Sequence, residues 1–275
     1  GYGGYNIFNF VDDFDVIQRK IKEAKDLFFT VSNEQEKINL YDEISKWQLE
    51  LIKNVLFNKN EYELFNEVQD MMKKRTKPFF LWQFEFDRVF DNGGFDIVIA
   101  NPPYIQLQSN QGKLAKELEK QGYETFARTG DIYCIFYEQA INLLKKDGVF
   151  AFITSNKWMR AGYGEKLRGY LAKNTNPLLL VDFGGVKVFE SATVDVNVLV
   201  ASKSQNQGKT KATLVDDTCT DLLSVLVEQA NIDSFSNSSS WIILNNSLEQ
   251  SIIKKVNKNG TKLSNWNINI YYGIK

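Results

Sequence analysis

From Phe95 onward, short apolar runs alternate with helical segments, and this alternation constrains the fold more than any other feature. Runs typical of strands lie at 95–100, 149–154, 178–183, 195–202, 212–215 and 241–244. Segments with apolar residues at three- and four-residue steps lie between and after them, at 132–144, 165–173, 222–230 and 248–256. Strands that alternate with helices form parallel βαβ units. The sequence therefore predicts an α/β fold with a doubly wound sheet, and the continuous run at 95–100 predicts a strand covered on both faces.

A helical region precedes this alternation. Between residues 11 and 56, apolar residues recur at helical spacing on both sides of the segment Ser32-Asn33-Glu34-Gln35-Glu36. This segment resembles an N-cap with acidic residues in the first turn. We therefore expect a helical hairpin, followed by a third helix at 61–74. Residues 1–78 would form a structural arm. The stretch at 231–240 is rich in serine and asparagine and predicts a loop.

The composition excludes several kinds of chemistry. The chain has no histidine, which excludes Ser-His-Asp and Cys-His catalysis and every metal site that needs histidine. Lys and Arg number 33 against 34 Asp and Glu, so any face that binds nucleic acid must be local. No apolar run approaches the roughly 18 residues that span a bilayer, and two cysteines are too few for a disulfide framework. We expect a cytoplasmic protein without a membrane partner.

The strand at 95–100 ends in the tetrapeptide Asn101-Pro102-Pro103-Tyr104. In an open α/β sheet, ligands bind beyond the carboxyl ends of the strands. Two successive prolines fix φ and donate no N–H, so the loop is rigid and presents free carbonyl groups. The Asn101 amide and the Pro102 carbonyl offer two acceptors, and Tyr104 offers a flat face. This combination suits a planar substrate that bears an NH₂ group, whereas the structural alternative is a proline turn with a strand-capping asparagine.

Residues 95–104, read as FDIVIANPPY, resemble the catalytic motif of amino-methyltransferases that use S-adenosylmethionine. Further segments follow in the order seen in adenine-specific DNA methyltransferases of the type IIG restriction-modification kind. These are GDIYCIF at 130–136, LLKKDGVFAFI at 143–153 and VDFGGVKVFE at 181–190. The resemblance covers about 79–202, which is under half of the chain.

This resemblance implies a Rossmann-like methyltransferase sheet that methylates the exocyclic amine of adenine in duplex DNA. Asn101 and Pro102 would accept the amine hydrogens, and Pro103 would keep their loop rigid. Tyr104 and Phe189 would hold the two faces of a base flipped out of the duplex. Asp131 and Phe136 would lie near the cofactor. Asp131 could instead only cap the helix that follows it, and Phe189 could be an ordinary core residue.

The family places a glycine-rich cofactor loop before this motif, and nothing between residues 1 and 95 fits that pattern. We therefore expect an internal fragment of a longer enzyme, inactive alone and with weak or no binding of S-adenosylmethionine. Residues 79–262 would hold part of the catalytic domain, and 263–275 would begin a target-recognition domain. The expected partners are duplex DNA and the rest of the parent polypeptide, which would carry the main cofactor loop and, if the parent cleaves DNA, an endonuclease domain.

Other functions stay open at this point. Protein-glutamine and RNA-guanine methyltransferases also use an NPPY-type loop, and a non-catalytic DNA-binding or assembly module could retain the loop as a scaffold. The helical arm, the segment around Phe189 and the tail at 263–275 favour DNA as the substrate. A metal- or phosphate-dependent hydrolase is poorly supported, because the sequence has no Walker-type loop and no cluster of metal ligands.

Overall fold

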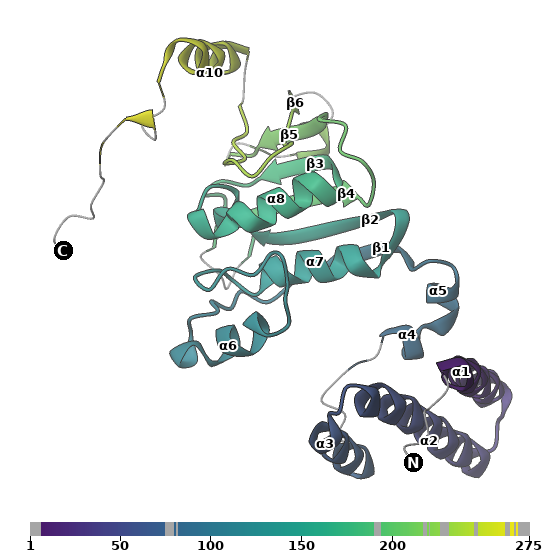
Figure 1. Ribbon diagram of the computed structural model, residues 1–275. Coiled ribbons are helices and arrows are strands. Elements are labelled where there is room, and N and C mark those ends of the chain that lie inside the picture. Colours follow the sequence, from purple (N-terminus) through teal and green to yellow (C-terminus); the bar gives the residue numbers. More distant parts are fainter. Residues whose placement is uncertain are drawn as a thin grey trace. The chain divides into compact units, whose positions relative to one another are not determined.

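The protein forms two compact units, residues 1–91 and 92–275, each with its own hydrophobic core (Figure 1). The computed structural model describes residues 7–74, 80, 82–189, 194–216, 219, 221–225, 231–244, 247–261, 265–266 and 268. No helix within these ranges is long and apolar enough to cross a membrane. The predicted domain limits at 78 and 262, and nearly all of the tail at 263–275, lie outside the described residues and stay predictions.

Unit 1 is helical, and the predicted hairpin and third helix are confirmed. Its helices are α1 (Ile7–Thr30), α2 (Glu34–Asn58), α3 (Tyr62–Lys73), α4 (Trp82–Glu85) and α5 (Asp87–Asp91). Within the segment predicted to hold an N-cap, Asn33 is the capping residue, because its Oδ1 accepts hydrogen bonds from the N–H groups of Gln35 (2.9 Å) and Glu36 (3.1 Å). The core of the hairpin joins Ile21 of α1 to Leu51 of α2, which is fully buried.

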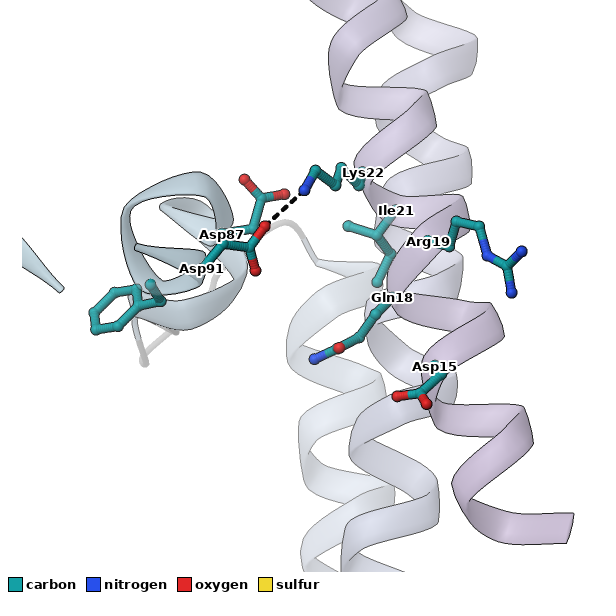
Figure 2. A pocket seen from close by; sticks show the side chains of 8 residues that line it. Asp15, Gln18, Arg19, Ile21, Lys22, Asp87 and Asp91 are labelled. Carbon is teal, nitrogen blue, oxygen red and sulfur yellow. Dashed lines mark hydrogen bonds and ion pairs between the residues drawn. The ribbon is translucent and has the colours of Figure 1, made fainter. Parts of the chain in front are cut away.

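Charged side chains connect α1 to α5 beside a cavity of about 430 Å³ (Figure 2). Lys22 Nζ lies 2.6 Å from Asp91 Oδ2, and Lys25 Nζ lies 3.8 Å from Asp87 Oδ2. The Lys22 and Asp91 side chains are 44% and 58% exposed, so water and salt screen their attraction. These contacts orient α5 within unit 1 but add little to its stability.

Unit 2 is built on a six-stranded sheet, which confirms the α/β fold. The strands are β1 (Phe95–Ala100), β2 (Leu144–Ser155), β3 (Asn176–Asp182), β4 (Val196–Ser202), β5 (Thr210–Leu214) and β6 (Asn231–Asp233). The helices are α6 (Lys113–Glu119), α7 (Tyr133–Leu143), α8 (Glu165–Asn174), α9 (Leu222–Ser224) and α10 (Ser247–Asn259), with 3₁₀ turns η1 (Asn110–Gly112), η2 (Asn156–Met159) and η3 (Gly162–Gly164). The strand order is β1-β2-β4-β3-β5-β6.

Four strands of this sheet run in one direction, and β4 and β6 run in the other. β1 pairs with β2 in parallel and β3 pairs with β5 in parallel, whereas β4 lies antiparallel between β2 and β3. The prediction of parallel pairing is therefore wrong for β4. The physical reason is its connection, because the described residues between β3 and β4 contain no helix that could return the chain for a parallel pairing.

Two local predictions in the second half of unit 2 are also wrong. Residues 241–244 form no strand, although Trp241 and Ile243 are buried as strand residues often are. Trp241 instead stacks on Phe235 with ring centroids 4.9 Å apart, and its backbone N–H donates to the Met159 carbonyl. The extra strand is β6, which lies within the stretch predicted as a loop and pairs with β5.

The main core lies between the sheet and helices α7 and α8, which cover one face (Figure 1). Phe150 and Phe152 of β2 point into this core and are almost completely buried. On β1, Val98 packs against the same core, but Ile97 and Ile99 point to the other face and are 62% and 76% exposed. The prediction that this strand is covered on both faces is therefore wrong. In the described part of the chain, β1 is an edge strand that pairs only with β2.

Candidate active site

The predicted loop begins where β1 ends, at the carboxyl end of the strand. Gly94 precedes β1 with φ of +121°, and a Cβ there would lie 2.5 Å from the Leu143 carbonyl oxygen, so only glycine allows this approach to the chain entering β2. In the loop itself, Asn101 and Pro103 are exposed, Pro102 is buried and Tyr104 is half-buried. The Tyr104 hydroxyl donates a hydrogen bond of 3.4 Å to Asn101 Oδ1. This hydrogen bond fixes the Tyr104 ring and the Asn101 side-chain amide relative to each other.

Asp131 fixes the far end of this loop. Its Oδ1 accepts the N–H of Ile105, directly after Tyr104, at 2.8 Å. The N–H groups of Ile132 and Tyr133 at the start of α7 lie close to the carboxylate and lower its pKa. Backbone bonds from Leu107 to Gly130 and from Ile132 to Ile105 join the same two segments. Burial raises the pKa of the Asp131 carboxyl, and the three N–H groups and the charge of Lys157 oppose that rise.

A cavity of about 420 Å³ lies next to the loop. Its volume is in the range of small-ligand pockets. It is lined by Tyr104, Ile105, Gln106, Ser109, Thr129, Gly130, Asp131, Tyr133, Ser155, Lys157, Tyr163 and Val194. Its wall thus combines aromatic rings with one acidic and one basic side chain among the described residues.

Three tyrosines form the aromatic part of the cavity wall. The rings of Tyr104 and Tyr133 meet edge to face, with centroids 6.1 Å apart. The hydroxyls of Tyr133 and Tyr163 lie 2.6 Å apart and share a hydrogen bond. Burial raises the pKa of Tyr104, with a smaller contribution from the charge of Asp131, and burial raises the pKa of Tyr163 to about 12. All three are therefore neutral hydroxyls at neutral pH that can donate hydrogen bonds.

Hydrogen bonds connect the residues that follow β2 to the end of β3 and the loop that follows it. Asp182, which is buried, accepts hydrogen bonds from Asn156 Nδ2 at 2.8 Å and from the Gly184 N–H at 3.0 Å. Arg160 approaches the same carboxylate at 3.5 Å. This cluster fixes the start of the segment that leads to Phe189.

The structure brings some of the predicted site residues together. Tyr104 and Asp131 line one cavity, and Asn101 is bonded to Tyr104. Phe136 is 38% exposed on α7, and Phe189 is half-buried at the end of a described stretch; neither is among the described residues that line the cavity. Their roles stay predictions.

Sequence reasoning missed Lys157 and Tyr163, although both line the cavity. Lys157 could have been found, because it follows the strand next to β1 and so lies at the same end of the sheet. Tyr163 comes from a 3₁₀ turn, which leaves no periodic signal in a sequence. Among the described residues, no group of three or more Asp, Glu or Cys side chains could hold a metal ion.

Comparison with known proteins gives a consistent set of relatives. The family described as "Eco57I restriction-modification methylase" matches residues 17–189. "Type II methyltransferase M.BstVI" of Geobacillus stearothermophilus is 29% identical over 131 residues, which is 48% of this chain and 23% of that protein. "Type II restriction enzyme and methyltransferase RM.Eco57I" of Escherichia coli is 26% identical over 155 residues, which is 56% of this chain and 15% of that protein.

A similar solved structure is that of a nuclease-deletion mutant of the Type ISP restriction-modification enzyme LlaGI with a DNA substrate mimic. It is 18% identical with a TM-score of 0.44, and the match covers 61% of this chain and 17% of that one. The chain thus spans less than a quarter of the length of these curated relatives and of this solved chain.

Proposed function

The chain belongs to the Eco57I restriction-modification methylase family, and from this we propose that its parent enzyme is a site-specific adenine DNA methyltransferase. The reaction would be transfer of a methyl group from S-adenosylmethionine to the exocyclic amine of adenine in duplex DNA, as part of a restriction-modification system. Several relatives are named as type II or adenine-specific methyltransferases, which supports this reaction class.

One observation carries the proposal: a rigid Asn101–Tyr104 loop that opens beside a tyrosine-lined cavity at the carboxyl end of β1. Asn101 Oδ1 and the Pro102 carbonyl would accept the two hydrogens of the adenine amine. The nitrogen lone pair, delocalised into the ring in free adenine, would then localise and become nucleophilic. Pro103 would keep the two acceptors in place, and Tyr104 would stack on one face of the base, with Phe189 proposed for the other.

The rate of such a transfer depends mainly on how well the amine is aligned with the methyl group. The amine attacks in line, so holding it in position supplies much of the rate, and no imidazole is required. The Tyr104 hydroxyl, which now donates to Asn101, would keep the amide oxygen oriented until the amine replaces it. When bound, S-adenosylmethionine supplies an electrophilic methyl group on a sulfonium.

The chain's own contribution to the cofactor site is limited. Phe136 presents a partly exposed ring on α7 and is our candidate cofactor contact. Asp131 is a weaker candidate, because its Oδ1 already accepts the backbone N–H of Ile105. We propose that the main cofactor loop belongs to another segment of the parent polypeptide, which together with duplex DNA would be the partner of this chain.

The test is methyl transfer by the full-length protein that carries this chain. Asn101→Ala should lower the rate on duplex DNA by at least about 100-fold, the effect of removing one hydrogen bond that polarises a reacting group. Thermal unfolding should not change, because Asn101 is exposed. Gln108→Ala, in an exposed position on the same loop but not on the cavity wall, is the matched control and should keep wild-type activity.

The outcomes separate the competing functions. Unchanged methylation by Asn101→Ala would contradict the role of its amide. Methyl transfer to a release-factor protein or to RNA, without transfer to duplex DNA, would favour the other amino-methyltransferases. Absence of transfer to all three substrates would favour a non-catalytic module.

A further inference from the structure

Lys157 carries the one cationic side chain among the described residues that line the cavity beside Tyr104. It lies two residues after the end of β2, in the 3₁₀ turn η2. Ser155 Oγ accepts its backbone N–H, and the next two residues, Trp158 and Met159, are fully buried. The backbone at Lys157 is therefore fixed by the core, while its side chain is exposed at the cavity.

The charge of Lys157 is available for a ligand. Asp131 is the acidic residue of the same wall, but its Oδ1 already accepts the N–H of Ile105. Within the described residues, the Lys157 ammonium makes no hydrogen bond and no ion pair within 4.0 Å, and it feels Asp131 only through the longer-range attraction of their charges. The remaining wall offers hydroxyl, amide and aromatic groups that are neutral.

We propose that Lys157 binds the phosphate adjoining the nucleotide whose base lies against Tyr104. This inference rests on the proposed function and adds a second anchor to it. A base that leaves a duplex brings its sugar and flanking phosphates to the mouth of the pocket that receives it. A lysine ammonium binds phosphate as a compact point charge with three donors. The base would thus be held by the loop and the backbone by Lys157, which sets the depth at which the amine reaches Asn101.

The experiment needs neither the recognition sequence nor the cofactor. The 275-residue chain is titrated with 2′-deoxyadenosine, with its 5′-monophosphate and with its 3′-monophosphate, at low salt and with binding followed by NMR. Wild type should bind at least one monophosphate about tenfold more tightly than the nucleoside, which is the lower limit expected for one charge-assisted hydrogen bond.

Substitutions then assign this preference to Lys157. Lys157→Gln should bind the nucleoside as wild type does but lose the preference for the monophosphate, and Lys157→Arg should keep most of it. Lys166→Gln is the matched control, because Lys166 is exposed on α8 and does not line the cavity. It should behave as wild type.

Four results would overturn the inference. Equal affinities of wild type for nucleoside and monophosphates, or a preference that survives in Lys157→Gln, would exclude Lys157 as a phosphate contact and leave the base pocket standing. Loss of nucleoside binding in Lys157→Gln would make Lys157 a structural counter-charge to Asp131. If wild type binds no deoxyadenosine at all, the base pocket of the proposed function fails together with the phosphate contact.

Discussion

At the scale of single residues, Asp131 joins two segments that are far apart in the sequence. Its carboxylate accepts the N–H of Ile105, which follows the loop, and lies close to the N–H groups of Ile132 and Tyr133 near the start of α7. The position of Tyr104 relative to the cavity thus depends on a side chain that would not itself contact the base. Asp131 is therefore better placed to position the loop than to bind a cofactor.

The pKa of Asp131 leads to a prediction about stability and pH. Burial raises the pKa above the ordinary value of 3.8, so the folded state favours the protonated carboxyl. Its contribution to stability is fully present below pH 3.8 and is lost as the pH rises through the raised pKa. Asn cannot titrate and keeps the Oδ1 acceptor. Urea unfolding should therefore show Asp131→Asn gaining stability relative to wild type between pH 4 and pH 7.

A second carboxyl provides the control for this measurement. Lys145 forms a side-chain hydrogen bond and ion pair with Asp96 and lowers the pKa of that exposed carboxyl. The stability of Asp96→Asn relative to wild type should therefore fall as the pH rises, or stay constant, whereas that of Asp131→Asn should rise. If the unfolding free energies of wild type and Asp131→Asn change with pH in parallel, burial does not raise the pKa of Asp131.

The residues of the candidate site were only partly predictable from sequence. Asn101, Tyr104 and Asp131 stand out because each lies at a junction between predicted elements. Their association at one end of the sheet follows from the topology of parallel strands. Lys157 could have been found, since it comes just after the strand next to β1, but Tyr163 lies in the turn η3, and its place on the cavity wall depends on packing in three dimensions.

At the scale of elements, helices and strands with strong periodicity were predicted well. The hairpin of α1 and α2, the helix α8 and the strands β1, β3 and β4 lie within a few residues of their predicted limits. The direction of β4 was not predictable, since the alternation of residues along a strand is the same whichever way its neighbour runs. A strand was wrongly predicted at residues 241–244 for a related reason. Trp241 is buried because its ring stacks on another ring, and a residue buried in this way gives the same apolar pattern as a residue of a strand.

The start of α2 gives a prediction that belongs to this scale. Asn33→Ala removes the acceptor for the N–H groups of Gln35 and Glu36, so unit 1 should lose about 1 kcal/mol of unfolding free energy, the usual effect of losing an N-cap. Asn33→Ser keeps an acceptor and should lose much less. The measurement is urea unfolding followed by helical circular dichroism. Equal losses in the two variants would show that the cap contributes nothing specific.

At the scale of the whole molecule, the two units have separate cores, and we expect them to unfold in separate transitions. Leu51 is fully buried in unit 1, and Leu167 is fully buried in unit 2. Replacing either by Ala should remove about 2–5 kcal/mol from its own unit, as for other buried leucines. Calorimetry should show Leu51→Ala lowering one transition temperature and Leu167→Ala lowering the other. A shift of both transitions by either substitution would indicate a single cooperative unit.

The exposed side of β1 also governs how the protein behaves in concentrated solution. In the described part of the chain this strand pairs on one side only, and it carries Ile97 and Ile99 on an uncovered face. A long apolar edge strand is a template on which another extended chain can add, and natural proteins commonly guard such edges with charges, prolines or bulges. Within β1 the one charge, that of Asp96, is already paired with Lys145. Aggregation should therefore start at the strand that leads into the Asn101–Tyr104 loop, so that loss of solubility and distortion of the candidate site would be the same event.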